Sequence, residues 1–528
     1  MDHGAMAVRL SDLRLSSERS DLCELLPFVC QRIFELNTRT GRIGMAMSKS
    51  SKWWLIAGAL LTGAAHMRWG VGALAWIAPI PYLIYLRATG GAASRAWFAL
   101  ALFAGYVLAV LKICTAPIPP VMSLLFALPT TLLMLTAYLA WVIAIRRGPT
   151  FLAPLVFAAA TVVAEFAQHR FTPFASWGAV AYTQIDNLPL LQVSSLVGMA
   201  GVSFVVNWVA ASLEDSWQSR GSTWRPLAIS VAVTLMATGW GTFRLGQATL
   251  GETVIVAAVG TDATVSGFPH PSVAEMEAVN QALFARTAKA ALAGAKLVSW
   301  TEASTLVLAQ NEPAFIERLS TAAKSAQIEL VAAYIVPDDA TRTYENKYVW
   351  VRPDGSVDHT YLKHHPVPGE PATAGVAPQQ VVETAAGRAA GAICYDFDFP
   401  ALARAQALLG IDLAVVPSSD WLGIDPIHAQ MASVRAIEGG FSLLRSTRMG
   451  LTAAYDPYGR ARAWESSFEA KDRIVIAALP RHGIKTLYTA IGDIFVLICA
   501  AFIVLSLGVP RLRTWVLLTD TVVRSRQR

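Results

Sequence analysis

Charged side chains are sparse in two long stretches of this chain, and this depletion constrains the fold more than any other feature of the sequence. The chain is 54% hydrophobic and 15% charged, whereas soluble proteins carry about 25% charged residues. The depletion covers about residues 52–250 and returns at about 486–507. Apolar runs of this length cross a bilayer. We therefore expect an α-helical transmembrane bundle, interrupted by one soluble domain before the last span.

The apolar runs predict seven spans and then an eighth. We place them at about residues 53–67, 70–87, 95–114, 120–145, 150–168, 190–212, 226–244 and 488–509. Basic residues gather in alternate gaps between these spans: Arg87, Arg95, Arg146, Arg147, Arg220 and Arg225. By the positive-inside rule those gaps face the cytoplasm, so the soluble domain is expected on the other side. The arginines that follow the eighth span agree with this orientation.

Composition divides the chain into four parts. We expect a polar tail at residues 1–47, a membrane domain at 48–248, a soluble domain at 249–482, and a final helix with a basic tail at 483–528. Met45 and Met47 directly precede the first span, and one hypothesis places the start of the protein there. The basic residues beside the spans account for the net charge of +6, so this charge does not indicate nucleic-acid binding. The five cysteines show neither metal nor disulfide spacing.

The soluble domain alternates strand and helix patterns, which predicts an α/β layered fold. The expected strands are 253–260, 296–302, 328–336, 348–352, 357–361, 412–417 and 473–479. The expected helices are 273–292, 313–326, 401–409 and 427–438. We expect hairpin turns at 353–355 and at 387–388, the second of which leads into the strand before Cys394.

Three chemically active side chains stand at or near strand ends: Glu302, Lys363 and Cys394. Strand ends are where α/β domains commonly assemble sites. A carboxylate that removes the thiol proton, a thiolate that attacks a carbonyl group, and an ammonium that stabilises the oxyanion would make a coherent set. The structural alternative is an ion pair between Glu302 and Lys363, with Cys394 as a small buried side chain.

The order Glu, Lys, Cys, with a strand leading into Cys394-Tyr395-Asp396, resembles the nitrilase (carbon–nitrogen hydrolase) superfamily. The segments 416–421, 428–438 and 444–459 resemble the region after the nucleophile in that family. The resemblance implies a nitrilase-like α-β-β-α sandwich. One branch, the apolipoprotein N-acyltransferases, places this domain between several membrane spans and a last one, and the chain from about residue 50 resembles that arrangement.

This resemblance implies a ping-pong acyltransferase of the bacterial inner membrane. Cys394 would accept an acyl chain from a phospholipid and pass it to the α-amino group of a diacylated apolipoprotein. Glu302 would act as base and Lys363 as oxyanion stabiliser, with Glu370, Tyr395 and Asp396 in support. The reaction needs no cofactor and no metal, and we expect a monomer.

The sequence departs from that branch in places, which leaves alternatives open. Trp300-Thr301-Glu302 replaces the usual Trp-Pro-Glu, the segment from Glu370 to Cys394 is short, and the loop at 260–271 has no Trp. The second hypothesis is a membrane-anchored amidase or acyltransferase that acts on another amine or amide. The third is a non-enzymatic membrane protein with a degenerate domain.

Features outside the triad also leave choices open. Glu165 lies within an expected span, where a carboxylate is a functional candidate. The aromatic loop at 170–184, which contains Trp177, is either an interface belt or a lipid-facing platform beneath the domain. His364 and His365 are expected to be solvated or interface residues.

Overall fold

The computed structural model describes residues 51–147, 150–222, 224–248, 251–261, 270–470 and 472–508. The predicted polar tail at 1–47, the basic tail after residue 508 and most of the loop at 260–271 lie outside the described residues. The described chain consists of a helical part and an α/β part.

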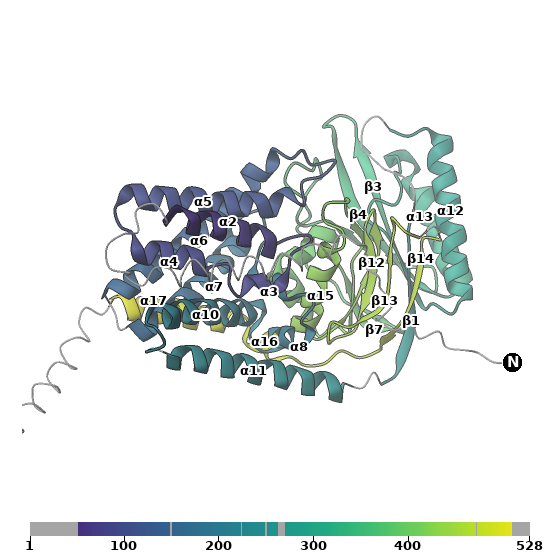
Figure 1. Cartoon of the computed structure of the whole chain (residues 1–528). Helices are drawn as coiled ribbons and strands as arrows, with labels where there is room; N and C mark the ends of the chain where they lie inside the picture. Colours follow the sequence, from purple (N-terminus) through teal and green to yellow (C-terminus); the bar gives the residue numbers. More distant parts are fainter. Residues whose placement is uncertain are drawn as a thin grey trace, which may run out of the picture. The chain divides into compact units, whose positions relative to one another are not determined.

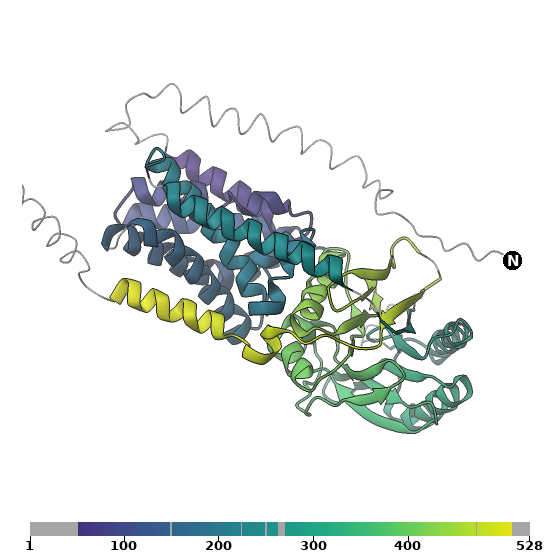
Figure 2. The same ribbon diagram turned by 90° about the horizontal axis from the view of Figure 1, so that it is seen from below.

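Long apolar helices form the helical part and run side by side in Figures 1 and 2. They are α2 (Ser51–Ala65), α4 (Ile80–Ala88), α5 (Ala92–Leu111), α6 (Met122–Arg147), α7 (Ala153–Phe171), α10 (Met199–Gln218) and α11 (Trp224–Gln247). The last helix, α17 (Ile494–Gly508), returns to this part after the α/β part. There Val496 and Cys499 pack with Ala159 and Val162 of α7.

Short helices and turns lie between the larger elements of both parts. The short α-helices are α3 (Gly72–Ala75), α8 (Leu188–Leu191), α9 (Ser194–Val197) and α16 (Leu487–Ile491). The 3₁₀ turns are η3 (Thr150–Leu152), η4 (Val180–Gln184), η5 (Ala309–Asn311) and η6 (Cys394–Asp398). The last of these turns begins at the predicted nucleophile.

Among the described residues, three helices are long and apolar enough to cross a membrane: α5, α6 and α11. The count of seven spans and an eighth stays a prediction. Two of the expected spans are not continuous helices. The run at 70–87 is broken into α3 and α4 around Pro79, and the run at 190–212 is broken into α8, α9 and α10. Gly198 separates α9 from α10 with a φ of 70°, a left-handed conformation that an apolar run does not reveal.

Two six-stranded sheets build the α/β part. The first has the order β14-β1-β2-β3-β4-β5 and the second the order β13-β12-β10-β8-β7-β6. The strands of the first sheet are β1 (Thr253–Val259), β2 (Leu297–Trp300), β3 (Glu329–Asp338), β4 (Thr343–Val351), β5 (Val357–Leu362) and β14 (Ile474–Pro480). Those of the second are β6 (Val382–Thr384), β7 (Gly387–Gly391), β8 (Leu413–Val415), β10 (Ser442–Arg445), β12 (Leu451–Tyr455) and β13 (Ala461–Ser466). A small ladder pairs β9 (Ser418–Ser419) with β11 (Thr447–Arg448).

Three buried clusters show that these elements form four layers. One cluster joins the inner faces of the two sheets, with Val256 and Val331 from the first and Val415 from the second. A second lies between the first sheet and the helices α12 (Val273–Leu292) and α13 (Glu312–Ala326). The third lies between the second sheet and the helices α14 (Pro400–Leu408) and α15 (Ile427–Gly439). The predicted α-β-β-α sandwich is confirmed, and Figure 1 shows α12 and α13 on the outer side of the first sheet.

The expected elements of the α/β part agree with the structure within a few residues, with two exceptions. The second hairpin turns at 385–386 rather than at 387–388, because Gly387 already pairs with Thr384 in the ladder. The strands β10, β12 and β13 had no counterpart among the expected elements. They complete the sheet that carries Cys394.

Candidate active site

Strand directions bring the three predicted residues to corresponding strand ends. In the first sheet, β2 is parallel to β3, and β3 and β5 are each antiparallel to β4, so β2 and β5 run the same way. Glu302 follows the end of β2, and Lys363 follows the end of β5. In the second sheet, β7 and β8 are parallel, and the chain leaves β7 toward Cys394. In the structure, all three residues therefore follow the carboxyl ends of strands.

Lys363 lies between two carboxylates and is almost fully buried. Its Nζ donates to Glu302 Oε1 and to Glu370 Oε2, each at 2.8 Å. Asn346, on β4, donates from Nδ2 to both carboxylates, at 2.7 Å to Glu302 and 3.0 Å to Glu370. Tyr344 also donates to Glu370. Glu370, Asn346 and Tyr344 thus hold the ammonium and the Glu302 carboxylate in one geometry.

The charges of this cluster stabilise one another. Burial disfavours a charged lysine, but Glu302 and Glu370 outweigh it and raise the pKa of Lys363 well above its usual value. Burial would also raise the pKa of Glu370, but the charge of Lys363 outweighs it and lowers that pKa. The lysine therefore remains an ammonium at every ordinary pH.

Cys394 occupies a strained turn at the start of η6. Its φ is 47°, in the left-handed region that residues other than Gly rarely adopt, at a cost on the order of 1–3 kcal/mol. Backbone pairing between the β7 and β8 segments continues past the end of β7, because the Cys394 N–H donates to Pro417 O at 2.9 Å. The next residue, Ser418, accepts at its carbonyl oxygen from the Glu302 N–H at 3.2 Å. The backbone at 417–418 thus bridges Cys394 and Glu302.

The thiol is buried, and burial is the first cause of a pKa raised well above that of a free thiol. The Glu302 charge raises this pKa further, while the Lys363 charge lowers it. The thiol contacts Ser419 O at 3.6 Å. A resting thiol of this kind needs a base to become a nucleophile.

Asp396 fastens the nucleophile turn to the segment that carries Lys363. Its Oδ2 accepts from Tyr361 Oη at 2.9 Å and from the Ile393 N–H at 3.0 Å. Its Oδ1 accepts from the His365 N–H at 2.7 Å and lies 3.1 Å from His365 Nδ1. The His365 ring also stacks on Phe399, with centroids 4.0 Å apart. His365 is therefore partly exposed but held against the nucleophile turn.

The nucleophile turn is also bonded to the loop after α7. Tyr395 Oη donates to Pro173 O at 2.7 Å. Trp177 Nε1 donates to Asp398 Oδ2 at 2.8 Å, and Ser176 donates to the Asp398 carbonyl from both its N–H and its hydroxyl. The predicted aromatic loop thus lies directly against the α/β part and contacts the turn that begins with Cys394.

Glu165, the predicted candidate within a span, supports this loop. Its Oε1 accepts from the Val180 N–H at 2.8 Å, at the start of η4. The carboxylate thereby fixes the chain that follows Trp177. This contact supports a positioning role within the helical part and involves no reacting group.

A second buried cluster lies beside Cys394. His428 Nδ1 is 2.7 Å from Asp420 Oδ1, and His428 Nε2 is 3.0 Å from Asp398 Oδ1. Arg445 donates to both oxygens of Asp420, at 2.8 and 3.0 Å. Donor atoms of Cys394, Asp420 and His428 all lie within 4.8 Å of one another.

That donor set does not fit a metal ion, because its ligands are already engaged. Burial opposes the charged form of His428, but Asp398 and Asp420 outweigh it and raise the pKa of His428 to about 9. An imidazolium cannot ligate a cation. The guanidinium of Arg445 occupies the Asp420 oxygens, so the cluster is a network of paired charges.

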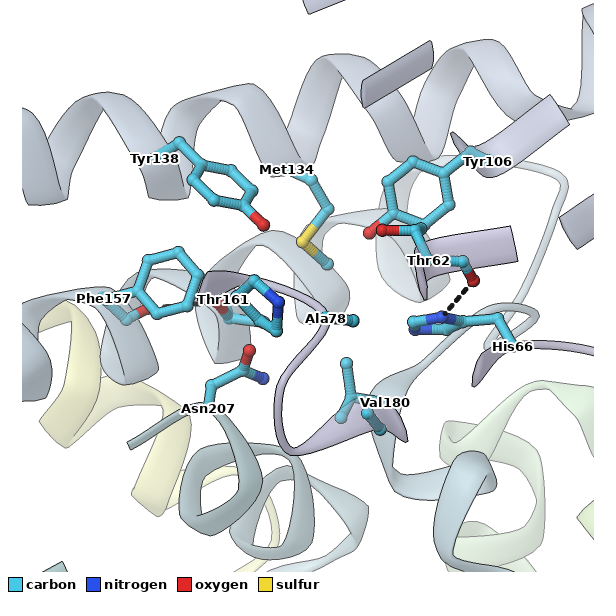
Figure 3. Close-up of a pocket in the computed structure, with 12 residues that line it drawn as sticks. Thr62, His66, Ala78, Tyr106, Met134, Tyr138, Phe157, Thr161, Val180 and Asn207 are labelled. Atoms are coloured by element: carbon cyan, nitrogen blue, oxygen red, sulfur yellow. Dashed lines mark hydrogen bonds between the residues drawn. The ribbon is translucent and has the colours of Figure 1, made fainter. Parts of the chain in front are cut away.

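A small cavity in the helical part lies apart from this site. Its volume is about 30 Å³, and its lining includes Thr62, His66, Tyr106, Tyr138 and Asn207. Figure 3 shows these polar groups around one space, with His66 hydrogen-bonded to Thr62. None of the lining residues belongs to the cluster around Cys394. The volume suits one or two water molecules and is far too small for an acyl chain.

Sequence reasoning missed several residues that the fold brings to the site. These are Asn346, Tyr361, His365, Asp398, Asp420, His428 and Arg445. One available signal was the presence of charged residues inside otherwise apolar segments, as at Asp420 and Arg445. Buried charges are almost always paired, so such residues indicate partners elsewhere in the fold.

Comparison with known proteins identifies the class that the fold and the site define. A family model described as carbon–nitrogen hydrolase matches residues 256–489, so the α/β part is a carbon–nitrogen hydrolase domain. A second model, the apolipoprotein N-acyltransferase N-terminal domain, matches residues 57–212. The two matches lie in this order along one chain, and the chain belongs to the apolipoprotein N-acyltransferase family.

Curated relatives agree over most of the chain. The apolipoprotein N-acyltransferase of Bradyrhizobium diazoefficiens is 27% identical over 397 residues, which cover 66% of this chain and 72% of that protein. The apolipoprotein N-acyltransferase of Geobacter metallireducens is 27% identical over 478 residues, which cover 82% of this chain and 90% of that protein. An amidase from Nesterenkonia sp. is a similar solved structure, with 19% identity and a TM-score of 0.37 over 47% of this chain and 96% of that chain.

Proposed function

We propose that the protein is an N-acyltransferase that moves an acyl chain from a membrane phospholipid to the α-amino group of the diacylglyceryl cysteine of an apolipoprotein. Cys394 carries the acyl chain between the two substrates as a thioester. Glu302 is the general base, and the Lys363 ammonium stabilises the oxyanion. Glu370, Tyr395 and Asp396 hold these groups in place.

The observation that carries the proposal is the attachment of the nucleophile turn to the helical part. Tyr395 and Asp398 both hydrogen-bond to the loop after α7. Phe171, at the end of α7 and two residues before Pro173, is a large apolar side chain that is 77% exposed. A thiol set at such a junction can receive an acyl chain directly from a lipid layer.

The first half-reaction forms the thioester. Glu302 accepts the thiol proton as the Cys394 sulfur attacks the ester carbonyl carbon of the phospholipid. The carbonyl oxygen becomes an oxyanion stabilised by Lys363 Nζ, which is already fixed by its 2.8 Å contacts. When the tetrahedral intermediate collapses, the C–O bond breaks, and Glu302 returns the proton to the leaving lysophospholipid.

The second half-reaction forms the amide. The neutral α-amino group of the apolipoprotein attacks the thioester carbonyl carbon, and Glu302 accepts a proton from the nitrogen. Lys363 again stabilises the oxyanion. Cleavage of the C–S bond releases the N-acylated product, and the proton held by Glu302 returns to the sulfur. The enzyme is restored without a cofactor.

The proposed location is a bacterial inner membrane, with the α/β part on the extracytoplasmic side. Two exposed positions test the side: Val376, in the α/β part, and Ala93, in the first turn of α5 beside Arg95. A membrane-impermeant maleimide is expected to label Val376→Cys in intact spheroplasts. Ala93→Cys should be labelled only after permeabilisation, with the unsubstituted protein as background. The reverse pattern would place the α/β part in the cytoplasm.

The thioester is tested by the intact mass of the detergent-purified protein after incubation with phospholipid. The wild type is expected to gain one acyl chain, and hydroxylamine should remove it. Cys394→Ser should gain no hydroxylamine-labile adduct, and Cys499→Ser, which replaces a thiol in the helical part, should behave as the wild type.

Two outcomes would overturn the assignment. A labile adduct of equal size on Cys394→Ser would exclude Cys394 as the acyl carrier. A folded wild-type protein that gains no adduct from any of several phospholipids would instead favour an enzyme that acts on amides.

A further inference from the structure

His428 is fully buried and lies beside the proposed nucleophile, yet the proposed mechanism does not use it. It is on α15, whereas its partners come from η6, the loop after β9, and β10. Both ring nitrogens point at carboxylates, Nδ1 at Asp420 and Nε2 at Asp398. A ring with a carboxylate at each nitrogen is best satisfied when both nitrogens carry protons.

The charges around the ring balance only when His428 is cationic. The groups that face it are Asp398, Asp420, Arg445 and Cys394, and Arg435 lies two turns further along the same helix, paired with Glu438. The cations Arg445 and His428 then match the anions Asp420 and Asp398. A neutral ring would leave one net negative charge buried beside the thiol, which would oppose formation of a thiolate.

The competing arrangement has a neutral ring. Arg445 Nη2 is 2.8 Å from His428 Nδ1, so Nδ1 could accept a hydrogen bond from the guanidinium. That tautomer would direct a lone pair at Asp420 Oδ1, only 2.7 Å away. The short contact to a carboxylate favours a proton on Nδ1.

We propose that His428 is a positioning residue for Cys394: a buried cation, held between Asp420 and Asp398, that balances the buried negative charge beside the thiol. The proposal rests on the proposed function only in treating Cys394 as the nucleophile. Because Asp398 also accepts from Trp177 Nε1, the network connects the loop of the helical part to the thiol.

The test measures the ionisation of Cys394 without any lipid substrate. The rate of its alkylation by iodoacetamide is followed by intact mass from pH 7 to 10, with Cys394→Ser as background. Because the pKa of this thiol lies well above that of a free thiol, the rate in this range is proportional to the thiolate fraction, and the ratio of the rates of two variants at one pH gives the shift of the midpoint. The thiolate absorbance at 240 nm, taken as wild type minus Cys394→Ser, reports the same fraction without reagent access. A protein that acylates nothing still reports on His428 in this assay, so failure of the proposed function is distinguishable.

His428→Gln is expected to raise the midpoint by about one to two pH units, because one charge at about 5 Å changes the pKa of a buried group by that order. Alkylation near pH 7 should slow by about 10-fold or more. The double variant Asp398→Asn/His428→Gln removes one anion together with the cation. It should return the midpoint to within about half a unit of the wild type.

The double variant separates charge from packing. If His428 only fills space, His428→Gln should lower thermal stability and leave the thiol midpoint unchanged. Adding Asp398→Asn should then restore neither the stability nor the alkylation rate. If the ring is neutral, the single variant should again leave the midpoint in place. Either result overturns the proposal, and the tryptophan emission of each variant in detergent shows whether it is folded.

Discussion

Replacing Glu302 by Gln is expected to slow thioester formation strongly while leaving the fold intact. In the wild type, Lys363 Nζ and Asn346 Nδ2 donate to Glu302 Oε1 at 2.8 and 2.7 Å. The amide oxygen of Gln can still accept both hydrogen bonds. The neutral amide cannot accept the thiol proton, and the raised pKa of Cys394 makes that transfer necessary at neutral pH. We expect the rate of adduct formation to fall by about 10²–10⁴-fold, the range of a general base.

The measurement is the single-turnover rate of adduct accumulation by intact mass. Glu329→Gln is the matched control, because Glu329 is a buried carboxylate at the amino end of β3 in the same sheet and accepts from Trp350 Nε1 at 2.8 Å. This control should retain the wild-type rate. A Glu302→Gln variant with more than a tenth of the wild-type rate would remove Glu302 from the role of base.

Lys363→Met is expected to cost both activity and stability. Removing the ammonium leaves Glu302 and Glu370 as two buried carboxylates that share only Asn346. Breaking a buried ion pair from one side costs about 3–5 kcal/mol. Loss of the oxyanion partner should reduce the rate of adduct formation by about 10²-fold or more.

The pH dependence identifies the cause of the lost stability. In the wild type the pKa of Glu370 is lowered, so its contribution is present above the unfolded pKa and declines as pH falls. In Lys363→Met the two carboxylates disfavour each other's charge, so the folded state loses stability as pH rises and both ionise. The stability deficit relative to wild type should therefore shrink as pH falls from 8 to 5.5.

Thermal unfolding in detergent at several pH values provides this test. The double variant Lys363→Met/Glu370→Gln, which removes one of the two carboxylates, should recover part of the stability at pH 8 and none of the activity. A deficit that is independent of pH, or a double variant no more stable than the single one, would show that Lys363 contributes by packing rather than by charge.

Local pattern was sufficient for much of the α/β part. The helix expected at 273–292 is α12, and the strands expected at 253–260 and 357–361 are β1 and β5 within one residue. Helical and strand periodicity, with a turn at Pro353-Asp354-Gly355, encodes these elements in short stretches of sequence. Strand ends then pointed to Glu302, Lys363 and Cys394, because a carboxyl end is a local feature.

The helical part was less predictable from hydropathy. A run of apolar residues shows that a segment avoids water but does not show where its backbone bends. The breaks at Pro79 and Gly198 turned two expected spans into shorter helices. Gly198 has a positive φ, and the Tyr488 ring lies so close that a Cβ at this position would be 2.7 Å from it. Tyr488 is distant in sequence, so no local pattern contains this constraint.

What the sequence alone determined was therefore the division into apolar and α/β parts, the order of most elements and the three residues at strand ends. Only the tertiary structure brought together Asp398, Asp420, His428 and Arg445 beside the thiol, since each comes from a different segment. The same holds for Asn346, which contacts Glu302 and Glu370 at once. The physical reason is that backbone periodicity acts over a few residues, whereas a buried charge is stabilised by whichever partner the fold brings within hydrogen-bond distance.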